Sequence, residues 1–390
     1  KNAALTAMAA ELEADAEKIL AANTKDIEQA EKNGLSAAMV DRLRLTEARL
    51  KSIAKGIRDV AALNDPVGEI IRAWTRPNGL EISKIRTPIG VIGIIYESRP
   101  NVTSDAGVLC LKTGNAVILR GGSEAIHSNI AIADALQKGG VRAGLPENAL
   151  QLIPTTDRDA VKFMAQMDAY IDVIVPRGGH ALIEAVVANA RMPVIKHYHG
   201  VCHIYVDKDA DFDMAEKLIV NSKCERPGVC NALETLLVHE SVASEFLKKL
   251  GPTLWDRNVE IRGDEATRAI LGKDVVAATE EDWTTEYLDL ILSIRVVPDF
   301  GTALDHLDRY GSHHSDAIVT KNKETAARFL SEVDSATVYW NASTRFTDGA
   351  EFGFGAEIGI STDKLHARGP MALEELTTYK YIIQGDGQIR

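Results

Sequence analysis

The loop between residues 223 and 231 contains the residue types best suited to covalent chemistry. It reads KCERPGVCN and places Cys230 after a predicted helix and before a predicted strand, with Lys223 and Arg226 close in sequence. Neighbouring cations lower the pKa of a thiol, and loop amides can bind an oxyanion after nucleophilic attack. Free cysteines are more often small buried hydrophobic residues, so both interpretations of Cys230 remain open from the residues alone.

The other cysteines of the chain are interpreted as packing residues. Cys110 and Cys202 lie inside apolar runs, and Cys224 lies close to the end of a predicted helix. Four cysteines in 390 residues are too few and too unevenly spaced for a disulfide framework. We therefore expect free thiols, with Cys230 as the candidate nucleophile.

Two glycine-containing turns each follow a predicted strand and precede a predicted helix, which is where an α/β sheet binds nucleotides. Glycine lets the backbone approach a phosphate, the following helix offers N–H groups, and an arginine can pair with the phosphate. The candidate cofactor-binding residues are Arg120, Gly121, Gly122, Ser123 and Glu124 in the first turn and Arg177, Gly178 and Gly179 in the second. Both segments could equally be tight turns without a ligand, since neither matches the GxGxxG or GxxxxGK(S/T) motif.

The densest group of potential metal ligands is formed by three histidines, His197, His199 and His203. The chain has no second cluster with the spacing of a metal site, such as HExxH or paired CxxC motifs. We therefore predict that these histidines bond to neighbouring polar groups and that the protein binds no metal.

Length, composition and charge indicate an ordinary globular protein of two or three domains. The 390 residues are 45% hydrophobic and 26% charged, and the formal net charge is −12. Because an acidic chain repels polyanions, we expect neither nucleic acid nor a membrane as a partner. The chain has no apolar run long enough to span a membrane and no signal-peptide pattern at its start, so a cytoplasmic location is expected.

The elements that must position these residues change in type along the chain. Helical spacing dominates to about residue 63, and strand patterns at 69–73 and 80–86 then flank a Pro-Asn-Gly turn, which predicts a hairpin. Strands alternate with helices from residue 90 to 206, which predicts a parallel sheet covered on both faces. A second α/β unit follows, and residues 376–383 form an added strand. The strands expected in the first sheet are 91–95, 116–119, 151–153, 171–175 and 203–206.

Several blocks along the chain resemble the aldehyde dehydrogenase superfamily, and within it the γ-glutamyl phosphate reductase family, also called glutamate-5-semialdehyde dehydrogenases. The blocks are DRLRL at 41–45, LNDPVG at 63–68, YESRPNVT at 96–103, KTGNAVILRGG at 112–122, PRGG at 176–179, VCNA at 229–232 and HARGP at 366–370. They cover nearly the whole chain, and their number and order make the resemblance specific.

The resemblance implies an aldehyde dehydrogenase-like α/β fold with a Rossmann-type cofactor domain, an α/β catalytic domain and a small oligomerisation hairpin. Residues 1–229 would form the cofactor domain, with the hairpin at about 69–87. Residues 230–362 would form the catalytic domain, and residues 363–390 would return to the cofactor domain and add an oligomerisation strand. A homodimer or a dimer of dimers is expected.

The resemblance also assigns roles to particular residues. Cys230 falls on the nucleophile of the superfamily, and the turns at 120–124 and 177–179 resemble its cofactor-ribose and pyrophosphate sites. Glu286 is similar to the glutamate that holds the nicotinamide ribose, with Leu288 at the accompanying apolar position. The cofactor implied is NADP(H).

The reaction implied is NADPH-dependent reduction of L-glutamyl 5-phosphate to L-glutamate 5-semialdehyde, with release of phosphate, in proline biosynthesis. Asn101 is the candidate oxyanion donor beside the Cys230 amide. The candidate cations for the phosphate and carboxylate of the substrate are Arg99, Arg226 and Arg345, although each could instead form a structural ion pair.

One segment departs from the pattern of the aldehyde-oxidising members. Many of these carry a glutamate that activates water to hydrolyse the thioester, whereas residues 196–203 here read KHYHGVCH and contain no carboxylate. A thioester that awaits a hydride should be protected from water, so this absence suits a reductase.

Other functions remain open at this point. The chain could be another acylating reductase of the superfamily, a cysteine acyltransferase or hydrolase that uses Cys230 with His239 and no nicotinamide, or a non-catalytic binding or scaffold protein. The preference for NADPH over NADH is also open, because Arg120 would favour a 2′-phosphate and Glu124 would oppose it.

Overall fold

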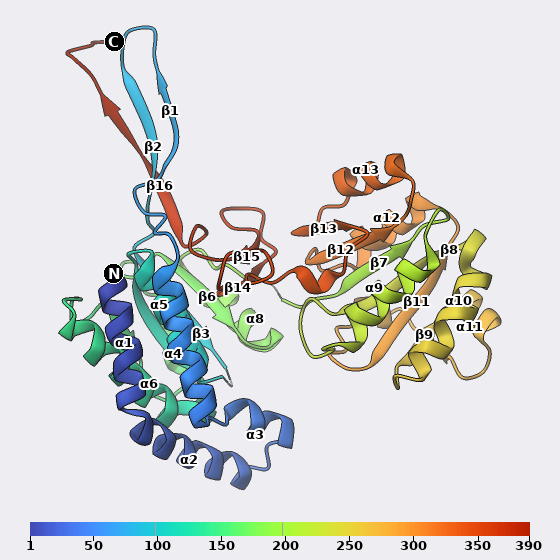
Figure 1. Ribbon diagram of the computed structural model, residues 1–390, viewed down its shortest axis with the longest axis horizontal. Helices are drawn as coiled ribbons and strands as arrows, with labels where there is room; N and C mark the ends of the chain where they lie inside the picture. The colour runs from blue at the N-terminus through green and yellow to red at the C-terminus, as the bar shows by residue number, and fades with distance from the viewer. Residues whose placement is uncertain (98, 197) are drawn as a thin grey trace. The chain divides into compact units, whose positions relative to one another are not determined.

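The computed structural model describes residues 1–97, 99–196 and 198–390, and the chain forms two compact units. The first unit comprises residues 1–196, 353–359 and 370–390, and the second comprises residues 197–352 and 360–369. The chain therefore passes between the units four times. Each unit has a parallel sheet of its own (Figure 1).

The first unit contains a helical layer, a parallel sheet and a separate antiparallel sheet. Its helices are α1 (Asn2–Ala14), α2 (Ala16–Lys32), α3 (Ala37–Leu43), α4 (Glu47–Ala62), α5 (Asn101–Lys112), α6 (Ile126–Arg142), α7 (Asp159–Ala165) and α8 (His180–Asn189). Its strands are β1 (Ile70–Thr75), β2 (Glu81–Pro88), β3 (Val91–Tyr96), β4 (Ala116–Gly121), β5 (Leu150–Leu152), β6 (Val173–Arg177) and β16 (Thr377–Gln384). Helix α1 packs against both α4 and α6, so the N-terminal helices cover one side of this α/β layer (Figure 1).

The parallel sheet of the first unit has the strand order β5-β4-β3-β6. This is the 3-2-1-4 order of dinucleotide-binding folds, in which a ligand binds at the carboxyl ends of the strands beside the first one. Ile95 of β3 and Ile174 of β6 pack with Met164 of α7 and Val186 of α8 on one face of the sheet. The predicted strands at 91–95, 116–119, 151–153 and 171–175 are thereby confirmed.

The predicted strand at 203–206 belongs to a different sheet. It is β7 (Cys202–Val206), and it pairs with β8 (Leu233–His239) and β12 (Ser315–Val319) in the second unit. The prediction was wrong because an apolar run indicates a buried strand without indicating its partners. For the same reason the division between the units follows residue 196, whereas the domain boundary expected from the sequence follows residue 229.

The second unit is a seven-stranded parallel sheet with helices on both faces, in the order β10-β9-β11-β8-β7-β12-β13. Its further strands are β9 (Glu260–Gly263), β10 (Val276–Ala277), β11 (Ile291–Val297) and β13 (Thr337–Trp340). Its helices are α9 (Phe212–Cys224), α10 (Glu240–Trp255), α11 (Glu265–Leu271), α12 (Phe300–Tyr310) and α13 (Lys323–Glu332), with short 3-10 helices η2 (Asp282–Thr284) and η3 (Thr344–Phe346). The short strands β14 (Gly359–Ser361) and β15 (Gly369–Met371) pair with each other.

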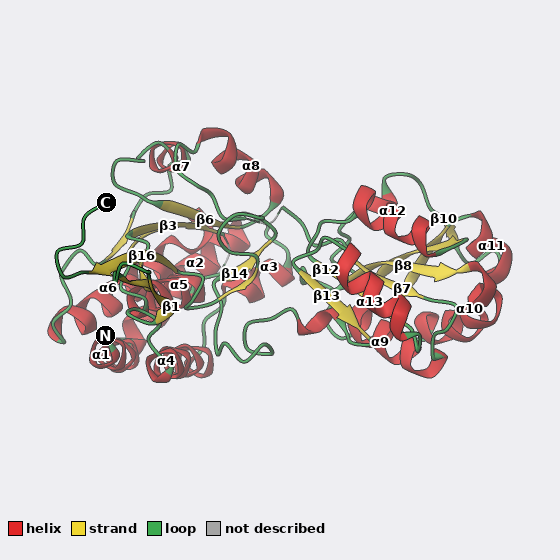
Figure 2. Ribbon diagram, turned by 90° about the horizontal axis from the view of Figure 1, so that it is seen from above, coloured by secondary structure: helices red, strands yellow, loops and turns green. Residues whose placement is uncertain are grey.

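Alternating residues of the central strands build the two layers of this core. Leu236 and Val238 of β8 pack in the cluster that includes α9 and α10, and Leu237 packs in the cluster that includes α12 and α13. Figure 2 shows the sheet between these two helical layers. The side chain of Asp211 caps α9 by accepting a hydrogen bond from Met214 N.

The predicted hairpin and added strand form a three-stranded antiparallel sheet, β1-β2-β16. Strand β16 pairs with β2 over its whole length, from Thr377 opposite Pro88 to Gln384 opposite Glu81. Figure 1 shows β16, from the red end of the chain, beside the blue hairpin. The hairpin at 69–87 and the strand at 376–383 are thus confirmed within one chain.

Among the described helices, none combines the length and the apolar character needed to cross a lipid bilayer.

Candidate active site

The two glycine turns of the first unit meet at one edge of its sheet. Tyr96, the last residue of β3, lies opposite Gly121 of β4 on one side and Arg177 of β6 on the other. The turns at 120–124 and 177–179 therefore both leave from the carboxyl ends of strands next to β3. This is the edge at which the strand order predicts a nucleotide.

Glu97, which directly follows β3, joins this edge to the second turn. Its backbone N–H donates to the carbonyl of Arg177 (3.0 Å), and its Oε2 accepts a hydrogen bond from Gly179 N (3.0 Å). A side chain at Gly178 would collide with the Glu97 carboxylate, which would have to move away from Gly179 N to make room for it. Glu97 was not among the predicted site residues, although it stands within the YESRPNVT block.

The first turn borders a cavity of ≈ 750 Å³ that lies wholly within the first unit. Ser123, Glu124, Glu97, Thr156 and Lys25 are among its lining residues. This volume is in the range of small-molecule and cofactor sites. Two predicted cofactor residues and Glu97 thus share one cavity with two lysines, Lys25 and Lys32.

The arginines of the two predicted cofactor turns, Arg120 and Arg177, both contact other parts of the protein. The buried guanidinium of Arg120 donates to the carbonyls of Thr156 (3.4 Å) and Asp157 (3.1 Å), and burial lowers its pKa. The guanidinium of Arg177 packs against the backbone of Gly359, where a Cβ would collide with it. Arg120 therefore holds the loop that forms one wall of the cavity.

Asn101 begins α5 at the same edge of the sheet, because α5 follows the carboxyl end of β3. Its amide nitrogen donates to Asp105 Oδ2 (2.8 Å), and burial raises the pKa of Asp105 to about 6. An amide nitrogen carries two hydrogens, so this bond uses one of them. Arg99, in the loop before α5, is exposed.

In the second unit, Cys230 lies in the loop between α9 and β8 and is partly exposed. Its carbonyl accepts a hydrogen bond from the buried Cys202 thiol (3.2 Å). A Cβ at Gly200 would lie 2.7 Å from the Cys230 Cα, so Gly200 packs its backbone directly against that of Cys230. Gly200 and Cys202 therefore fix the backbone of the candidate nucleophile.

The residue after Cys230 anchors the loop to η3. Asn231 Nδ2 donates to the carbonyls of Arg345 (3.2 Å) and Thr347 (3.0 Å), and Thr344 Oγ1 donates to the Asn231 carbonyl (2.8 Å). The Arg345 guanidinium donates to Asn231 Oδ1. Arg345 thus lies beside the Cys230 loop, and its Nε is also 3.9 Å from Glu225 Oε2, within ion-pair distance.

Glu286, although distant in sequence, lies beside Gly200. Burial raises the pKa of its carboxyl, and a hydrogen bond from the backbone of Gly200 opposes this shift. Glu286 is thereby connected through Gly200 to the Cys230 backbone. Leu288, two residues later, has a positive φ of 54° and an exposed side chain.

The structure therefore groups the predicted residues in two sets, one in each unit. The first set contains Arg99, Asn101 and both glycine turns, and the second contains Arg226, Cys230, Glu286, Leu288 and Arg345. Arg226 is exposed in the same loop as Cys230. The residues of the site that were not predicted are Glu97, Gly200, Asn231 and Glu234. Glu234 forms a buried ion pair with Lys223, which was predicted only as a nearby cation.

His239 does not lie near Cys230. It ends the seven-residue strand β8, whereas Cys230 precedes the start of that strand. At about 3.3 Å per residue the strand separates them by about 20 Å. His239 Nδ1 instead accepts a hydrogen bond from Ser241 N (3.2 Å) at the start of α10.

His203, one of the histidines considered as metal ligands, has another partner. The buried His203 bonds through Nδ1 to Asp316 Oδ1 (3.1 Å), while His197 lies outside the described residues. Within residues 1–97, 99–196 and 198–390, no group of three or more His, Cys, Asp or Glu side chains could hold a metal ion.

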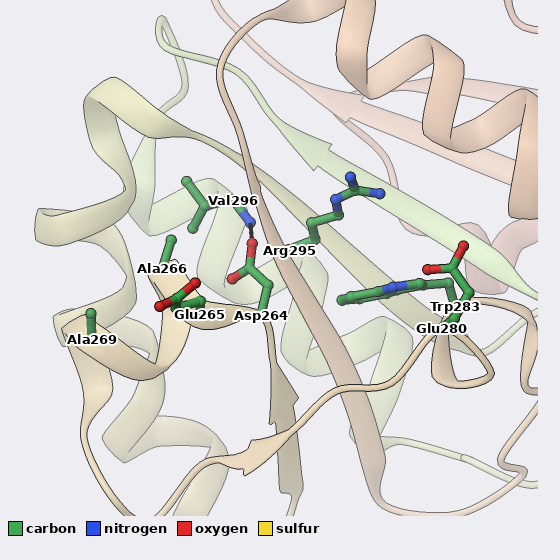
Figure 3. A pocket seen from close by; sticks show the side chains of 8 residues that line it. All are labelled: Asp264, Glu265, Ala266, Ala269, Glu280, Trp283, Arg295 and Val296. Carbon is green, nitrogen blue, oxygen red and sulfur yellow. Dashed lines mark hydrogen bonds between the residues drawn. The ribbon is translucent and has the colours of Figure 1, made fainter.

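A further cavity, of ≈ 630 Å³, lies at the opposite edge of the second sheet. Figure 3 shows Asp264, at the end of β9, and Arg295, near the end of β11, in its wall. Asp264 accepts hydrogen bonds from Val296 N (3.0 Å) and Thr267 N (2.8 Å), so it fixes the turn between β9 and α11. This cavity is separate from the candidate active site because Cys230 lies before the amino end of β8.

Comparisons with known proteins agree with this arrangement. The aldehyde dehydrogenase family model matches residues 1–269. The whole chain is 60% identical to the gamma-glutamyl phosphate reductase of Moorella thermoacetica and 57% identical to that of Geobacter metallireducens, and it covers 93% of each. The chain belongs to the gamma-glutamyl phosphate reductases of the aldehyde dehydrogenase family. The crystal structure of the gamma-glutamyl phosphate reductase of Thermotoga maritima matches with a TM-score of 0.98 at 48% identity, covering 100% of this chain and 94% of that one.

Membership of this family confirms two predictions from the sequence. The resemblance to the family is correct, and so is the aldehyde dehydrogenase-like α/β fold. The protein is accordingly an enzyme of the oxidoreductase class.

Proposed function

We propose that the protein catalyses the NADPH-dependent reduction of L-glutamyl 5-phosphate to L-glutamate 5-semialdehyde, with release of phosphate, in proline biosynthesis. The observation that carries the proposal is the position of Cys230, whose backbone is packed against Gly200 on one side and anchored through Asn231 on the other. The chain in which it lies is 60% identical to a gamma-glutamyl phosphate reductase. A cytoplasmic location, consistent with the acidic composition, forms part of the same proposal.

The first chemical step is attack of the Cys230 thiolate on the acyl-phosphate carbonyl carbon. A C–S bond forms, the C–O bond to phosphate breaks, and phosphate leaves with the bonding electron pair. The product is a thioester on Cys230. The proposed oxyanion donors are the Cys230 amide and Asn101, each worth about 3 kcal/mol of transition-state stabilisation.

NADPH, if held by the turns at 120–124 and 177–179 and by Glu286, would supply a hydride to the thioester carbonyl carbon. The tetrahedral thiohemiacetal then collapses, its C–S bond breaks, and the aldehyde leaves as Cys230 regains its thiolate. Backbone fixation of Cys230 by Gly200 and Asn231 serves both stages, since the same sulfur must meet the carbonyl carbon twice.

The residues of the first unit fit a dinucleotide. The cavity beside Ser123 and Glu124 lies at the sheet edge where the adenosine half of such a ligand binds, and the turn at 177–179 starts α8 at the same edge. Lys25 lines that cavity and can pair with a 2′-phosphate, which supports NADPH over NADH. Arg120 contributes less to the preference for NADPH than the sequence suggested, because its guanidinium donates hydrogen bonds to the carbonyls of Thr156 and Asp157.

Arginines beside the Cys230 loop suit a substrate that carries a phosphate and a carboxylate. Arg226 is exposed in that loop, and Arg345 lies against Asn231. A guanidinium binds either anion with two parallel hydrogen bonds. We assign these two arginines and Arg99 to substrate binding.

A cysteine hydrolase or acyltransferase that pairs Cys230 with His239 is not favoured, because β8 holds the two residues at opposite ends. Another acylating reductase of the superfamily is distinguished by its substrate. Turnover with an acyl-CoA and none with glutamate semialdehyde and phosphate would support that alternative.

The decisive test follows the reverse reaction, the phosphate-dependent reduction of NADP⁺ with glutamate semialdehyde. Cys230→Ala should abolish turnover, whereas Cys224→Ala, which removes the neighbouring thiol of the same loop region, should retain most of it. A Cys230→Ala enzyme with wild-type activity would refute the nucleophile assignment.

The antiparallel sheet supports a proposal of self-association. Its two edge strands are β1 and β16, and exposed apolar side chains gather on them: Ile70, Ile71, Tyr379, Tyr381, Ile382 and Ile383. Unpaired strand edges and exposed apolar patches are typical of interaction surfaces. We assign this sheet to the interface of a homodimer or a dimer of dimers.

A further inference from the structure

A buried ion pair closes the base of the loop that carries Cys230. Lys223, in the last turn of α9, and Glu234, the second residue of β8, are both 0% exposed, and their Nζ and Oε2 atoms are 2.6 Å apart. Helix α9 packs against β8, and in sequence the two residues stand on either side of the loop that joins these elements. The ion pair therefore fixes the two ends between which Cys230 is presented.

The same carboxylate also holds a second segment. Glu234 Oε1 accepts a hydrogen bond from Leu288 N (3.3 Å). Leu288 has a φ of 54°, in the left-handed region that leucine disfavours, and its side chain is 47% exposed. Since an exposed side chain contributes little packing, the strained backbone at Leu288 must be held by contacts such as this one.

Glu286, two residues before Leu288, connects this segment back to the nucleophile. Its carboxylate accepts a hydrogen bond from the backbone of Gly200 and is attracted by the charge of Lys223. Gly200 in turn packs against the Cys230 backbone. Lys223 and Glu234 thus flank the Cys230 loop, and Glu234 also bonds to the turn at 286–288.

Stability alone does not account for a charged pair at this place. Burial raises the pKa of Glu234 to about 7 and lowers that of Lys223, which reflects the cost of removing both charges from water. Apolar residues of similar volume often replace a buried ion pair without loss of stability. Such residues could fill the space, but they could not accept the Leu288 N–H.

We propose that Lys223 and Glu234 are a pair of positioning residues that set the Cys230 loop and the nicotinamide-side turn at 286–288 in fixed relation to each other within the second unit. The part that concerns nicotinamide rests on the proposed function. The part that concerns the Cys230 loop does not, because it can be measured without cofactor or substrate.

Two double variants separate positioning from folding. Lys223→Met with Glu234→Gln removes both charges but keeps an oxygen acceptor for Leu288 N. Lys223→Met with Glu234→Leu has the same charge and similar volume but lacks that acceptor. The two proteins therefore differ by one hydrogen bond to the turn, and their thermal unfolding should be similar.

The dissociation constant of NADPH, measured by fluorescence titration, reports on the turn. We expect the Glu234→Leu double variant to bind NADPH about tenfold more weakly than the Glu234→Gln double variant, the effect of one lost hydrogen bond. Equal dissociation constants in the two double variants would overturn the assignment of the turn.

The rate at which iodoacetamide alkylates Cys230, located by peptide mass spectrometry, reports on the loop. Both double variants should differ from the wild type by at least about threefold, because both lose the ion pair. Wild-type alkylation rates in both would overturn the assignment of the loop. Leu250→Ala, a cavity in the core of α10, is the matched control, and it should lower thermal stability while leaving both readouts unchanged.

Failure of the proposed function is a separate outcome. A wild-type protein that binds no NADPH would refute that function and the nicotinamide part together, while alkylation would still decide the part that concerns the loop. If neither double variant folds, the single variant Glu234→Gln is used instead. We expect it to alter the rate of Cys230 alkylation and to keep the NADPH dissociation constant within twofold of wild type. A tenfold weaker constant in that single variant would overturn the proposal.

Discussion

Replacement of Gly200 by alanine offers a direct test of how the nucleophile is held. The new Cβ would lie 2.7 Å from both the Cα and the carbonyl carbon of Cys230, whereas ordinary contacts begin at 3.4 Å. The new Cβ would overlap the Cys230 carbonyl oxygen even more closely, so the two segments must separate by more than about 0.7 Å, the difference between these distances. The Cys230 carbonyl would also move away from the Cys202 thiol, from which it accepts a hydrogen bond.

The expected effect on rate is larger than the effect on stability. Overpacking of this kind costs about 1–3 kcal/mol of folding free energy. A displacement near 1 Å of a reacting group costs about 100-fold in turnover, since the sulfur leaves its attack geometry. Gly200→Ala should therefore fold, with a lowered unfolding midpoint, and turn over about 100-fold more slowly.

The assay is the phosphate-dependent reduction of NADP⁺ with glutamate semialdehyde, run beside thermal unfolding and alkylation of Cys230. Gly56→Ala is the matched control, because a Cβ at this position in α4 meets no atom within 4 Å. It should keep wild-type turnover and gain up to about 1 kcal/mol from helix propensity. Full activity and unchanged alkylation in Gly200→Ala would refute the reasoning.

Three further predictions concern other parts of the molecule. Although burial raises it, hydrogen bonds from Arg262, Thr279 and Tyr287 together lower the pKa of Asp282 to about 2, so Asp282→Asn should lose about 2 kcal/mol of stability. Because the folded pKa lies below the unfolded one, the difference in unfolding free energy between wild type and Asp282→Asn should be constant from pH 8 to 5 and shrink as the pH falls below about 4. Urea unfolding measures this difference, and a change in it between pH 8 and 6 would contradict the prediction. Lys25→Met should raise the KM for NADPH about tenfold while leaving that for NADH unchanged, and steady-state kinetics in which both rise equally would remove Lys25 from 2′-phosphate binding. Ile383→Asp, at an exposed position of β16, should shift the protein toward monomers in light scattering without altering Cys230 alkylation, and an unchanged mass would point to another interface.

The extent to which the fold follows from the sequence depends on whether a signal is local. The hairpin at 70–88 and the strand β16 were predicted because turn residues and strand spacing are local properties. The partners of β7 were not, since Cys202–Val206 is a buried apolar run that suits either sheet equally. The expected domain boundary at residue 229 differs from the division after residue 196 for the same reason.

The candidate site shows the same contrast between local motifs and distant contacts. Cys230 and the glycine turns stand in blocks that can be read directly from the sequence. The contacts that hold them, such as Gly200 against Cys230 and Glu234 with Leu288, join residues 30 and 54 positions apart. Lys223 was noted only as a nearby cation, because the sequence does not show that its charge is buried against Glu234.

The pairing of β2 with β16 has a consequence for synthesis of the chain. Arg86 of β2 and Thr377 of β16 are 291 positions apart. At a synthesis rate of about 5–20 residues per second, β2 remains without its partner strand β16 for roughly 15–60 s. During that interval the edge of β2 that β16 later covers is open to pairing with a strand of another chain.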